Sequence, residues 1–467
     1  MAYVGIGNRQ DYVADFQSQN FSGDGSTTAF TLNYEAVTGS IRVAVDNVLQ
    51  PADGSSYTVD GFTLNFDTAP ASGTNNITIL FLGTVRNISS VSDGAIINSK
   101  IQDNTIQAAK LAYDYNQYRN IIINGDMSIA QRGTSATGLG EGDSGIHTCD
   151  RWKMFESGVP TYEFTQTQDT DVPTGQGFAT SLKMDCTTAQ GSLTSSDLLR
   201  IIQIIEGQNL QYLKYGTANA TSLTASFWVK STVTGDYNTH LYASGATNRI
   251  ISSTFTINSA DTWEKKTITF AGDTAQVIPN DSTGRLLLTI TLLSGTDYTS
   301  TDATSWGTYS GGKLAYGQVA NIASSTANNF YITGVQLEAG TTASDFEFLP
   351  VDVNLNRCLR YYQFVANTSN IDLCVGAYYS ANSILGSIQL KEVMRTTPSI
   401  DIETGTNYYA SFLNNTVDLL NTFTLSSSSH NRSICLVNST EASGIVGYAC
   451  ILRANSSNSF LAFDAEL

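Results

Sequence analysis

The sequence predicts a mainly β protein made of several small sandwiches, and three observations carry this prediction. Only 14% of the 467 residues are charged, whereas the sheet-favouring Tyr (23) and Phe (20) are frequent and Pro (7) is rare. Alternating apolar residues recur about every 8 to 14 positions between turns rich in Gly, Asn and Ser. Helical periodicity is nearly absent. We therefore expect an N-terminal small β-sandwich, a short shaft, a central jelly-roll β-sandwich and a C-terminal small β-sandwich tip.

Residues 1–86 form the first predicted unit. Alternating apolar positions at 30–34 and 41–45 precede apolar runs at 57–66 and 77–82. The strings GDGS, DGSS and ASGTNN separate these runs and are typical of turns. Short antiparallel strands in a small sandwich follow from this spacing.

Residues 87–118 differ in pattern, because Ile96, Ile101, Ile106 and Leu111 recur every five residues. A five-residue period fits neither an isolated helix nor a heptad seam. So short a segment has no core of its own, and its apolar side chains must pack against something else. The simplest partner is copies of the same segment around an axis. The alternative is a partly helical linker that docks on its own domain.

Residues 119–350 form the largest predicted unit, a two-sheet jelly roll with Gly-rich connections. Six strings mark it in order: NGDM at 124–127, DRW at 150–152, IEGQN at 205–209, SFWVKS at 226–231, WEKKTITF at 263–270 and FYITGVQLEAG at 330–340. The stretch GGKLAYGQVANIASS at 311–325 fits none of these strings.

Residues 351–467 form the last predicted unit, a small terminal sandwich at the distal tip. A short helix is expected at 355–362. The strands are expected at 371–379, 383–391, 407–413, 420–425, 432–437 and 445–452.

The order of the six central strings resembles the carbohydrate-binding, galactose-binding-like sandwich of bacteriophage tail-fibre proteins of the T7-like podovirus type. The string CLRYY at 358–362 is similar to a CQRYY string in that family, and residues 20–83 are similar to its N-terminal attachment modules. The five-residue repeat is similar to intertwined three-chain shafts. The resemblance implies a homotrimer in the virion. Its N-terminus would bind tail adaptor or nozzle proteins, and its distal domains would bind a host-surface glycan or protein.

Sugar recognition requires flat aromatic faces and short polar side chains. Trp306 lies in such a predicted loop, and the alternative is that it folds back onto the sandwich. Trp228 and Trp263 lie within predicted strands and are interpreted as core. The candidate receptor-binding residues lie in predicted loops or at strand ends: Tyr298, Trp306, Tyr309, Tyr378, Tyr379, Tyr408, Tyr409 and His430.

Catalytic motifs such as HExxH and GxSxG do not occur, and the three histidines are isolated from one another. The loop 133–145 lacks the Lys-Ser/Thr ending of a P-loop and is predicted to be a mobile surface loop. The pairs Asp169/Asp171 and Glu141/Asp143 have the chemistry for glycoside hydrolysis. Among 41 acidic residues such pairs arise by chance, so we expect no enzyme. A polysaccharide depolymerase and a purely structural fibre or connector are the alternatives.

Cofactors and further partners are few. The resemblance allows a structural Ca²⁺ held by oxygen ligands, with Asp126 and Glu338 at the matching positions. Solvated or Arg-paired carboxylates are the alternative there. A net charge of −17 argues against nucleic acid, and no apolar run reaches membrane-spanning length. The six cysteines lack CxxC spacing and are expected to be buried thiols, although Cys435 and Cys450 could pair across strands.

Overall fold

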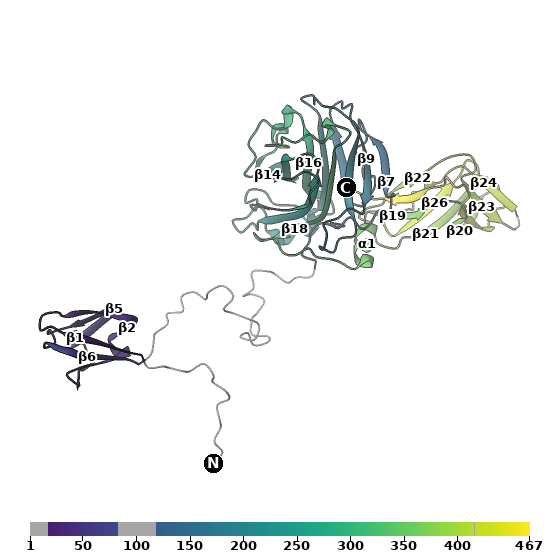
Figure 1. The fold of residues 1–467 in the computed structure, drawn as a ribbon. Helices are drawn as coiled ribbons and strands as arrows, with labels where there is room; N and C mark the ends of the chain where they lie inside the picture. Colours follow the sequence, from purple (N-terminus) through teal and green to yellow (C-terminus); the bar gives the residue numbers. More distant parts are fainter. Residues whose placement is uncertain (1–16, 83–117, 415) are drawn as a thin grey trace, which may run out of the picture. The chain divides into compact units, whose positions relative to one another are not determined.

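The computed structural model describes residues 17–82, 118–414 and 416–467, and the chain divides into two compact units, Met1–Lys110 and Leu111–Leu467 (Figure 1). Within these residues every strand pair is antiparallel and one α-helix occurs, which confirms the mainly β prediction. No helix of this part of the chain is long and apolar enough to cross a membrane. The predicted shaft residues Ile96, Ile101, Ile106 and Leu111 lie outside the described residues.

The first unit is a pair of small sheets around one apolar core. A four-stranded sheet has the order β1-β6-β3-β4, and β2 and β5 form a second, two-stranded antiparallel sheet. Leu32, Leu64 and Ile79 are among the side chains buried between them. The strands are β1 (Ser18–Gly23), β2 (Ala29–Val37), β3 (Ile41–Val45), β4 (Val48–Leu49), β5 (Tyr57–Phe66) and β6 (Gly73–Phe81).

The central domain is a sandwich of two six-stranded sheets. The sheet called sheet 1 here has the order β15-β12-β18-β10-β9-β7, and sheet 2 has the order β17-β14-β13-β16-β11-β8. Sheet 1 contains β7 (Ser135–Leu139), β9 (Glu163–Asp169), β10 (Ser181–Thr188), β12 (Leu223–Ser231), β15 (Glu264–Phe270) and β18 (Asn329–Ala339). Sheet 2 contains β8 (Lys153–Ser157), β11 (Leu198–Glu206), β13 (Gly235–Ala243), β14 (Arg249–Ile257), β16 (Gly284–Ser294) and β17 (Gly307–Thr308).

A single apolar cluster fills the space between sheets 1 and 2. Phe227 and Ile332 enter it from sheet 1, and Ile201 and Leu288 enter it from sheet 2. Alternate residues of these strands therefore face the core, and the others form the outer faces on which sites can be built. Short 3₁₀ turns interrupt the connections at η4 (Gly207–Leu213), η5 (Thr296–Tyr298), η6 (Gly311–Lys313) and η7 (Ile322–Ser324).

The C-terminal domain follows helix α1 (Val351–Leu359), which begins four residues before the expected helix. A seven-stranded sheet of order β24-β23-β27-β20-β21-β26-β25 packs with a three-stranded sheet of order β19-β28-β22. The strands are β19 (Tyr362–Ala366), β20 (Ile371–Ser380), β21 (Ser383–Gln389), β22 (Ser399–Ile402), β23 (Tyr409–Leu413), β24 (Thr416–Leu420), β25 (Thr424–Leu425), β26 (Ser433–Asn438), β27 (Ala449–Ala454) and β28 (Leu461–Asp464).

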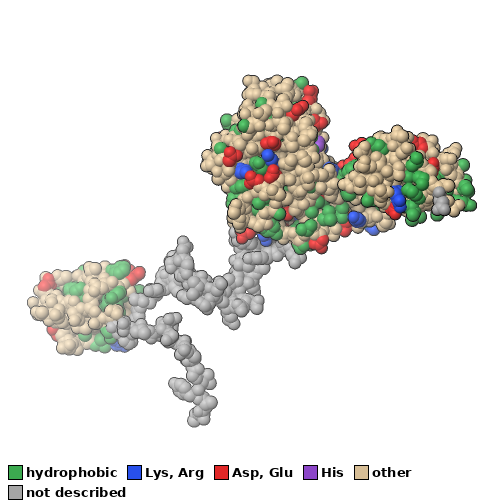
Figure 2. Space-filling view, turned by 45° about the vertical axis from the view of Figure 1, so that its right-hand side comes forward, with side chains coloured by type: hydrophobic (Ala, Val, Ile, Leu, Met, Phe, Trp, Pro, Cys, Tyr) green, Lys and Arg blue, Asp and Glu red, His purple; other side chains and the backbone are tan. Residues whose placement is uncertain are grey.

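The outer face of this seven-stranded sheet is apolar over two rows of directly paired residues, which we call the tip apolar face. The first row runs across β24, β23, β27 and β20. The second row runs across β27, β20, β21 and β26. Figure 2 shows hydrophobic side chains gathered on this domain. The rows are Val417, Phe412, Ile451 and Val375, and then Ala449, Ala377, Leu385 and Val437.

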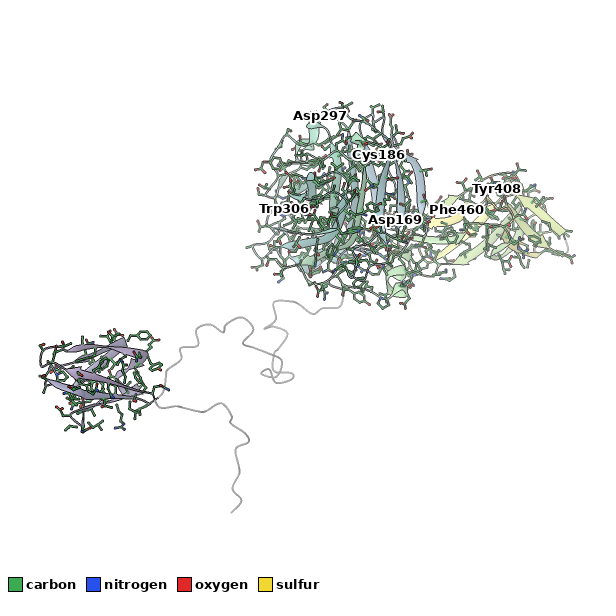
Figure 3. All side chains as sticks on the ribbon, viewed as in Figure 1. Asp169, Cys186, Asp297, Trp306, Tyr408 and Phe460 are labelled. Atoms are coloured by element: carbon green, nitrogen blue, oxygen red, sulfur yellow. The ribbon has the colours of Figure 1, made fainter. Side chains whose placement is uncertain are left out.

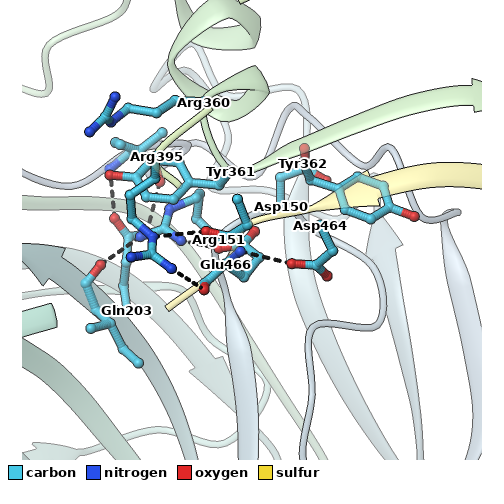
Figure 4. A network of polar contacts seen from close by, with 12 residues as sticks. Asp150, Arg151, Gln203, Arg360, Tyr361, Tyr362, Arg395, Asp464 and Glu466 are labelled. Carbon is cyan, nitrogen blue, oxygen red and sulfur yellow. Dashed lines mark hydrogen bonds and ion pairs between the residues drawn. The ribbon is translucent and has the colours of Figure 1, made fainter. Parts of the chain in front are cut away.

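Stacked arginines and tyrosines join the central and C-terminal domains (Figure 4). The guanidinium carbons of Arg132 and Arg151 each lie 3.5 Å from the ring centroids of Tyr362 and Tyr361, respectively. Arg151 also forms an ion pair with Glu466, which lies two residues beyond the last strand. A planar guanidinium suits both contacts at once.

Glu206, at the end of β11, is the buried acceptor of the same junction. Arg360 donates to both of its oxygens at 2.7 and 2.8 Å, and the Tyr361 hydroxyl donates at 2.6 Å. Burial alone would raise the pKa of Glu206, but these hydrogen bonds outweigh it and hold the pKa below its usual value. The CLRYY string therefore supplies the contacts that fix the C-terminal domain to the sandwich.

Two predicted local elements need correction, and the possible disulfide between Cys435 and Cys450 is not formed. The loop 133–145 contains strand β7, because Ser135 and Ala136 pair with β9. The strand expected at 420–425 is split into β24 and β25 by a turn. Cys435 and Cys450 are free thiols, like the other four cysteines.

Candidate functional site

A groove of about 360 Å³ lies on the outer face of sheet 1, and we call it the Trp228 groove. This volume falls within the range of roughly 300 to 1,000 Å³ that is common for small-ligand sites. Its walls combine aromatic rings with short or charged polar side chains. The residues that line the groove include Gln176, Phe178, Ser226, Trp228, Lys265, Asp345, Phe346 and Phe348.

Strand alternation places Trp228 in the groove. Phe227 and Val229 are fully buried in the core, so Ser226 and Trp228 lie on the opposite side of β12. Trp228 is half-buried, and among the described residues its indole N–H has no hydrogen-bond partner. The interpretation of Trp228 as core is therefore wrong. Its ring and its N–H are both available to a ligand.

Three phenylalanines form the aromatic wall of the groove. The Phe178 ring centroid lies 5.1 Å from that of Phe346 and 5.0 Å from that of Phe348, and Phe346 and Phe348 are 4.9 Å apart. Phe348 is 50% exposed, which is unusual for so large an apolar ring. Exposed aromatic faces of this kind can stack on the C–H faces of a sugar ring.

Gly334 in β18 allows the wall to lie close to the sheet. Its φ is +62°, and a Cβ there would lie 2.5 Å from the Phe178 ring. Only glycine meets both requirements without strain. The absence of a side chain at Gly334 within β18 therefore lets the Phe178 ring pack against the sheet, and this contact shapes the groove.

A ladder of charged and aromatic side chains continues along the same outer face. Lys230 Nζ lies 4.2 Å from the Tyr331 ring centroid and forms an ion pair with Asp171. The Trp263 indole donates to Asp171 at 2.9 Å, so the interpretation of Trp263 as core is also wrong. Burial raises the pKa of Asp171, but the hydrogen bonds from Lys230 and Trp263 outweigh it and lower the pKa. Asp171 therefore stays ionised, which makes it a poor general acid.

The loop expected to bind sugar is largely folded inward. Trp306 donates to the Ala271 carbonyl at 2.6 Å and packs edge-on against Tyr215 at 6.0 Å. The Tyr298 hydroxyl lies 3.2 Å from Ser157 Oγ. Tyr309 is 38% exposed and is the most exposed of these three aromatic residues. Trp306 therefore folds back onto the sandwich, as the alternative prediction for this residue has it.

The tip candidates divide into buried and exposed side chains, and Figure 3 shows that Trp306 and Tyr408 lie in different domains. Tyr378 and Tyr409 are fully buried and use their hydroxyls inside the domain, so they are not receptor contacts. Tyr408 packs partly against the core. Tyr379 is 75% exposed, and His430 is exposed where it forms an isolated β-bridge with Ser433.

The carboxylates expected to hold Ca²⁺ are not brought together. Asp126 accepts hydrogen bonds from Ser128 and Asn354 and lies beside Thr333 of β18. Glu338 stands five residues further along β18, about 16 Å at the usual rise per residue. Its oxygens accept from Gln336 and Ser344, and Arg119 lies 3.9 Å away. Among the described residues no group of three or more His, Cys, Asp or Glu side chains could hold a metal.

Three of the four carboxylates considered for hydrolysis have structural hydrogen-bond partners. Asp169 accepts from the Asp171 backbone N–H at 2.8 Å, and Asp171 is held as described above. Asp143 accepts from the Gly140 N–H at 2.9 Å, while Glu141 is exposed on the same turn. Neither pair lines the Trp228 groove.

Comparison with known proteins gives structural likeness alone. No family model and no curated protein sequence matches this chain. The enzymatically active domain of bacteriophage CBA120 tailspike protein 4 is similar over 48% of this chain and 22% of that one, at 13% identity and a TM-score of 0.26. The family 11 carbohydrate-binding module of Clostridium thermocellum, solved with a β-1,3-1,4-mixed-linked tetrasaccharide, is similar over 45% and 99%, at 10% identity and 0.22. TM-scores this low carry no conclusion about function.

Proposed function

We propose that this chain is a non-catalytic tail-fibre adhesin of a bacteriophage virion, which binds a host-surface glycan in the Trp228 groove. The groove itself is the observation that carries the proposal. It places an indole with a free N–H beside Phe348, with Gln176, Ser226, Lys265 and Asp345 around the rings. Aromatic faces and short polar groups in one shallow groove are what sugar binding requires.

The tail-fibre part of the proposal rests on the sequence resemblance set out above. By that resemblance, the N-terminal unit would attach to tail adaptor or nozzle proteins. The domains beyond residue 118 would contact the host. No covalent chemistry is needed, because adhesion requires only binding.

The proposed assembly is a homotrimer, and the occupant proposed for the tip apolar face is another copy of this chain. In the first row Val375 is 70% and Val417 50% exposed, and neighbouring exposed apolar side chains of this kind can mark an interaction surface. The Arg453–Asp372 pair at 2.5 Å lies beside the rows and is internally neutral. The pair therefore adds no net charge at this contact, although each copy carries −17 overall. Three weak glycan sites on one fibre would then gain avidity.

The test uses the purified full-length chain on an array of neutral and acidic polysaccharide fragments. Wild-type protein should retain at least one fragment class, and Trp228→Ala should lose it. Tyr212→Ala is the matched control, because Tyr212 is an exposed aromatic of the same domain that does not line the groove. Release of shortened fragments would favour a depolymerase instead. Failure to bind any fragment or host cell would favour a purely structural part.

A further inference from the structure

Arg200 of β11 differs from the other buried arginines of the central domain. It is 8% exposed, yet within the described residues its guanidinium forms neither an ion pair nor a hydrogen bond. Its Nε is completely buried without a partner. Arg249, on another strand of the same sheet, pairs with the buried Asp273 at 2.6 Å. An arginine that is desolvated and unpaired costs stability, so its retention calls for an explanation.

The surroundings of Arg200 are aromatic. Its guanidinium carbon lies 4.6 Å from the ring centroid of Phe155, the residue that pairs with it on β8. The hydroxyls of Tyr309 and Tyr298 are close enough to act on its charge, as is the neighbouring His240, and among the described residues no carboxylate forms an ion pair with it. Burial lowers the pKa of Arg200 to about 10, so the side chain is still positive at neutral pH. A fixed cation therefore stands among aromatic rings without a protein anion.

The end of this side chain is not completely covered. Nε is fully buried and unpartnered, whereas the two Nη atoms are not among the fully buried unpartnered atoms, so they share in the 8% exposure of the residue. Tyr309, 38% exposed, presents a ring that is braced edge-on by Tyr242 at 5.3 Å. The neighbouring His240 is kept neutral, because burial and the Arg200 charge lower its pKa well below the usual value. His240 therefore adds no second positive charge.

We propose that Arg200 binds the carboxylate of an acidic sugar, with the exposed ring of Tyr309 supporting the sugar beside it. Two Nη donors match a carboxylate in a bidentate geometry that lysine cannot reproduce. This site lies on the outer face of sheet 2, whereas the Trp228 groove lies on the outer face of sheet 1. It would add selectivity for uronate-containing polysaccharides, and it does not depend on the groove. A sulfate ester offers related anion chemistry, so the test separates the two.

The experiment is isothermal calorimetry of the full-length chain at low salt with three probes: an oligoglucuronate, a neutral glucose oligomer of equal length, and its sulfated derivative. The oligoglucuronate should bind more tightly than the neutral oligomer. Arg200→Met should lower the affinity for oligoglucuronate at least tenfold, and Arg200→Lys should lower it less. Trp228→Ala should leave the preference for oligoglucuronate over the neutral oligomer unchanged. Sulfated oligomer binding in place of oligoglucuronate would overturn the assignment to a carboxylate.

Thermal unfolding separates a binding role from a structural one. Arg200→Met removes an unpaired buried charge and keeps similar bulk, so the melting temperature should rise. Arg249→Met is the matched control, and it should lower the melting temperature because Asp273 loses its partner. A lower melting temperature for Arg200→Met with unchanged oligoglucuronate affinity would overturn the proposal. Tyr309→Ala is a second test, because Tyr309 is 38% exposed; it should lower the affinity for oligoglucuronate without loss of folding.

Discussion

Two outer sheet faces of this protein carry opposite chemistry. The outer face of sheet 1 holds a groove in which Trp228 and Phe348 are surrounded by amide, hydroxyl and charged groups. The tip apolar face is built mostly from aliphatic and small residues, such as Val375 and Ile451, with one aromatic ring, Phe412, all paired directly across strands. Both faces arise from the same strand alternation, so the backbone does not distinguish them. The difference lies in whether the outward residues can satisfy hydroxyl groups or can only exclude water.

The largest expected effect concerns the tip apolar face. Val375→Asp places a charge at the β20 end of the first row, on its most exposed side chain, and should reduce a trimer to monomers. Apparent affinity for host cells should then fall by about 10² to 10⁴, because avidity is lost. Light scattering and cell-binding assays measure the two effects. Val319→Asp, a 75% exposed position on the central domain, is the control and should change neither. Monomeric wild-type protein would contradict the proposed assembly.

The junction between the domains gives the next largest effect. Glu206→Ala leaves Arg360 and Tyr361 without their acceptor and should lower the free energy of unfolding by about 3 to 5 kcal/mol. Chemical denaturation measures this. An unchanged free energy would show that the junction contributes nothing to the stability of either face.

Glu206 also predicts a pH dependence of stability. Its pKa in the folded state lies below the ordinary value of 4.5, so its stabilising contribution is complete above pH 4.5. The contribution is lost as the pH falls through the folded-state pKa. Glu206→Gln should therefore show a shallower loss of stability than the wild type below pH 4.5, as followed by melting temperature. Equal slopes for the two proteins would contradict the assignment.

The groove itself is tested by Trp228→Ala, which should weaken binding of a neutral glycan by about 2 kcal/mol, roughly 30-fold. The free energy of unfolding should change little, because Trp228 is half-buried on the outer face. Calorimetry gives the affinity. A large loss of stability with normal affinity would make Trp228 a packing residue after all.

The smallest effect is expected at Gly334. Gly334→Ala adds backbone strain at positive φ and a clash with the Phe178 ring, whereas Gly340→Ala adds strain at positive φ with open space around it. The difference between the two variants should be about 1 kcal/mol in unfolding free energy. It should be accompanied by weaker glycan binding for Gly334→Ala alone. Identical behaviour would show that the phenylalanine wall moves freely.

The sequence predicts the strands well and the site only partly. Alternation around Phe227 and Val229 already places Trp228 outside the core, and that signal was available in the string SFWVKS. The contact between Phe178 and Gly334 could not be foreseen, because it depends on how distant strands are ordered in the sheet. Trp306 lies in a Gly- and Ser-rich segment that looks exposed, yet a backbone carbonyl at Ala271 captures its indole. Tertiary hydrogen bonding, which local pattern does not encode, decides which aromatic residues are free.

The arginine–tyrosine junction has a consequence for how the C-terminal domain can be exchanged between related chains. Arg132, Arg151 and Glu206 belong to the central domain. Their partners Tyr361 and Tyr362 come directly after helix α1, in the part of the chain beyond residue 350. A recombination breakpoint at residue 350 would separate donors from acceptors and leave buried charges unmatched. Stable chimaeras therefore have to inherit both sides of the junction together, so the inherited module is larger than the C-terminal domain alone.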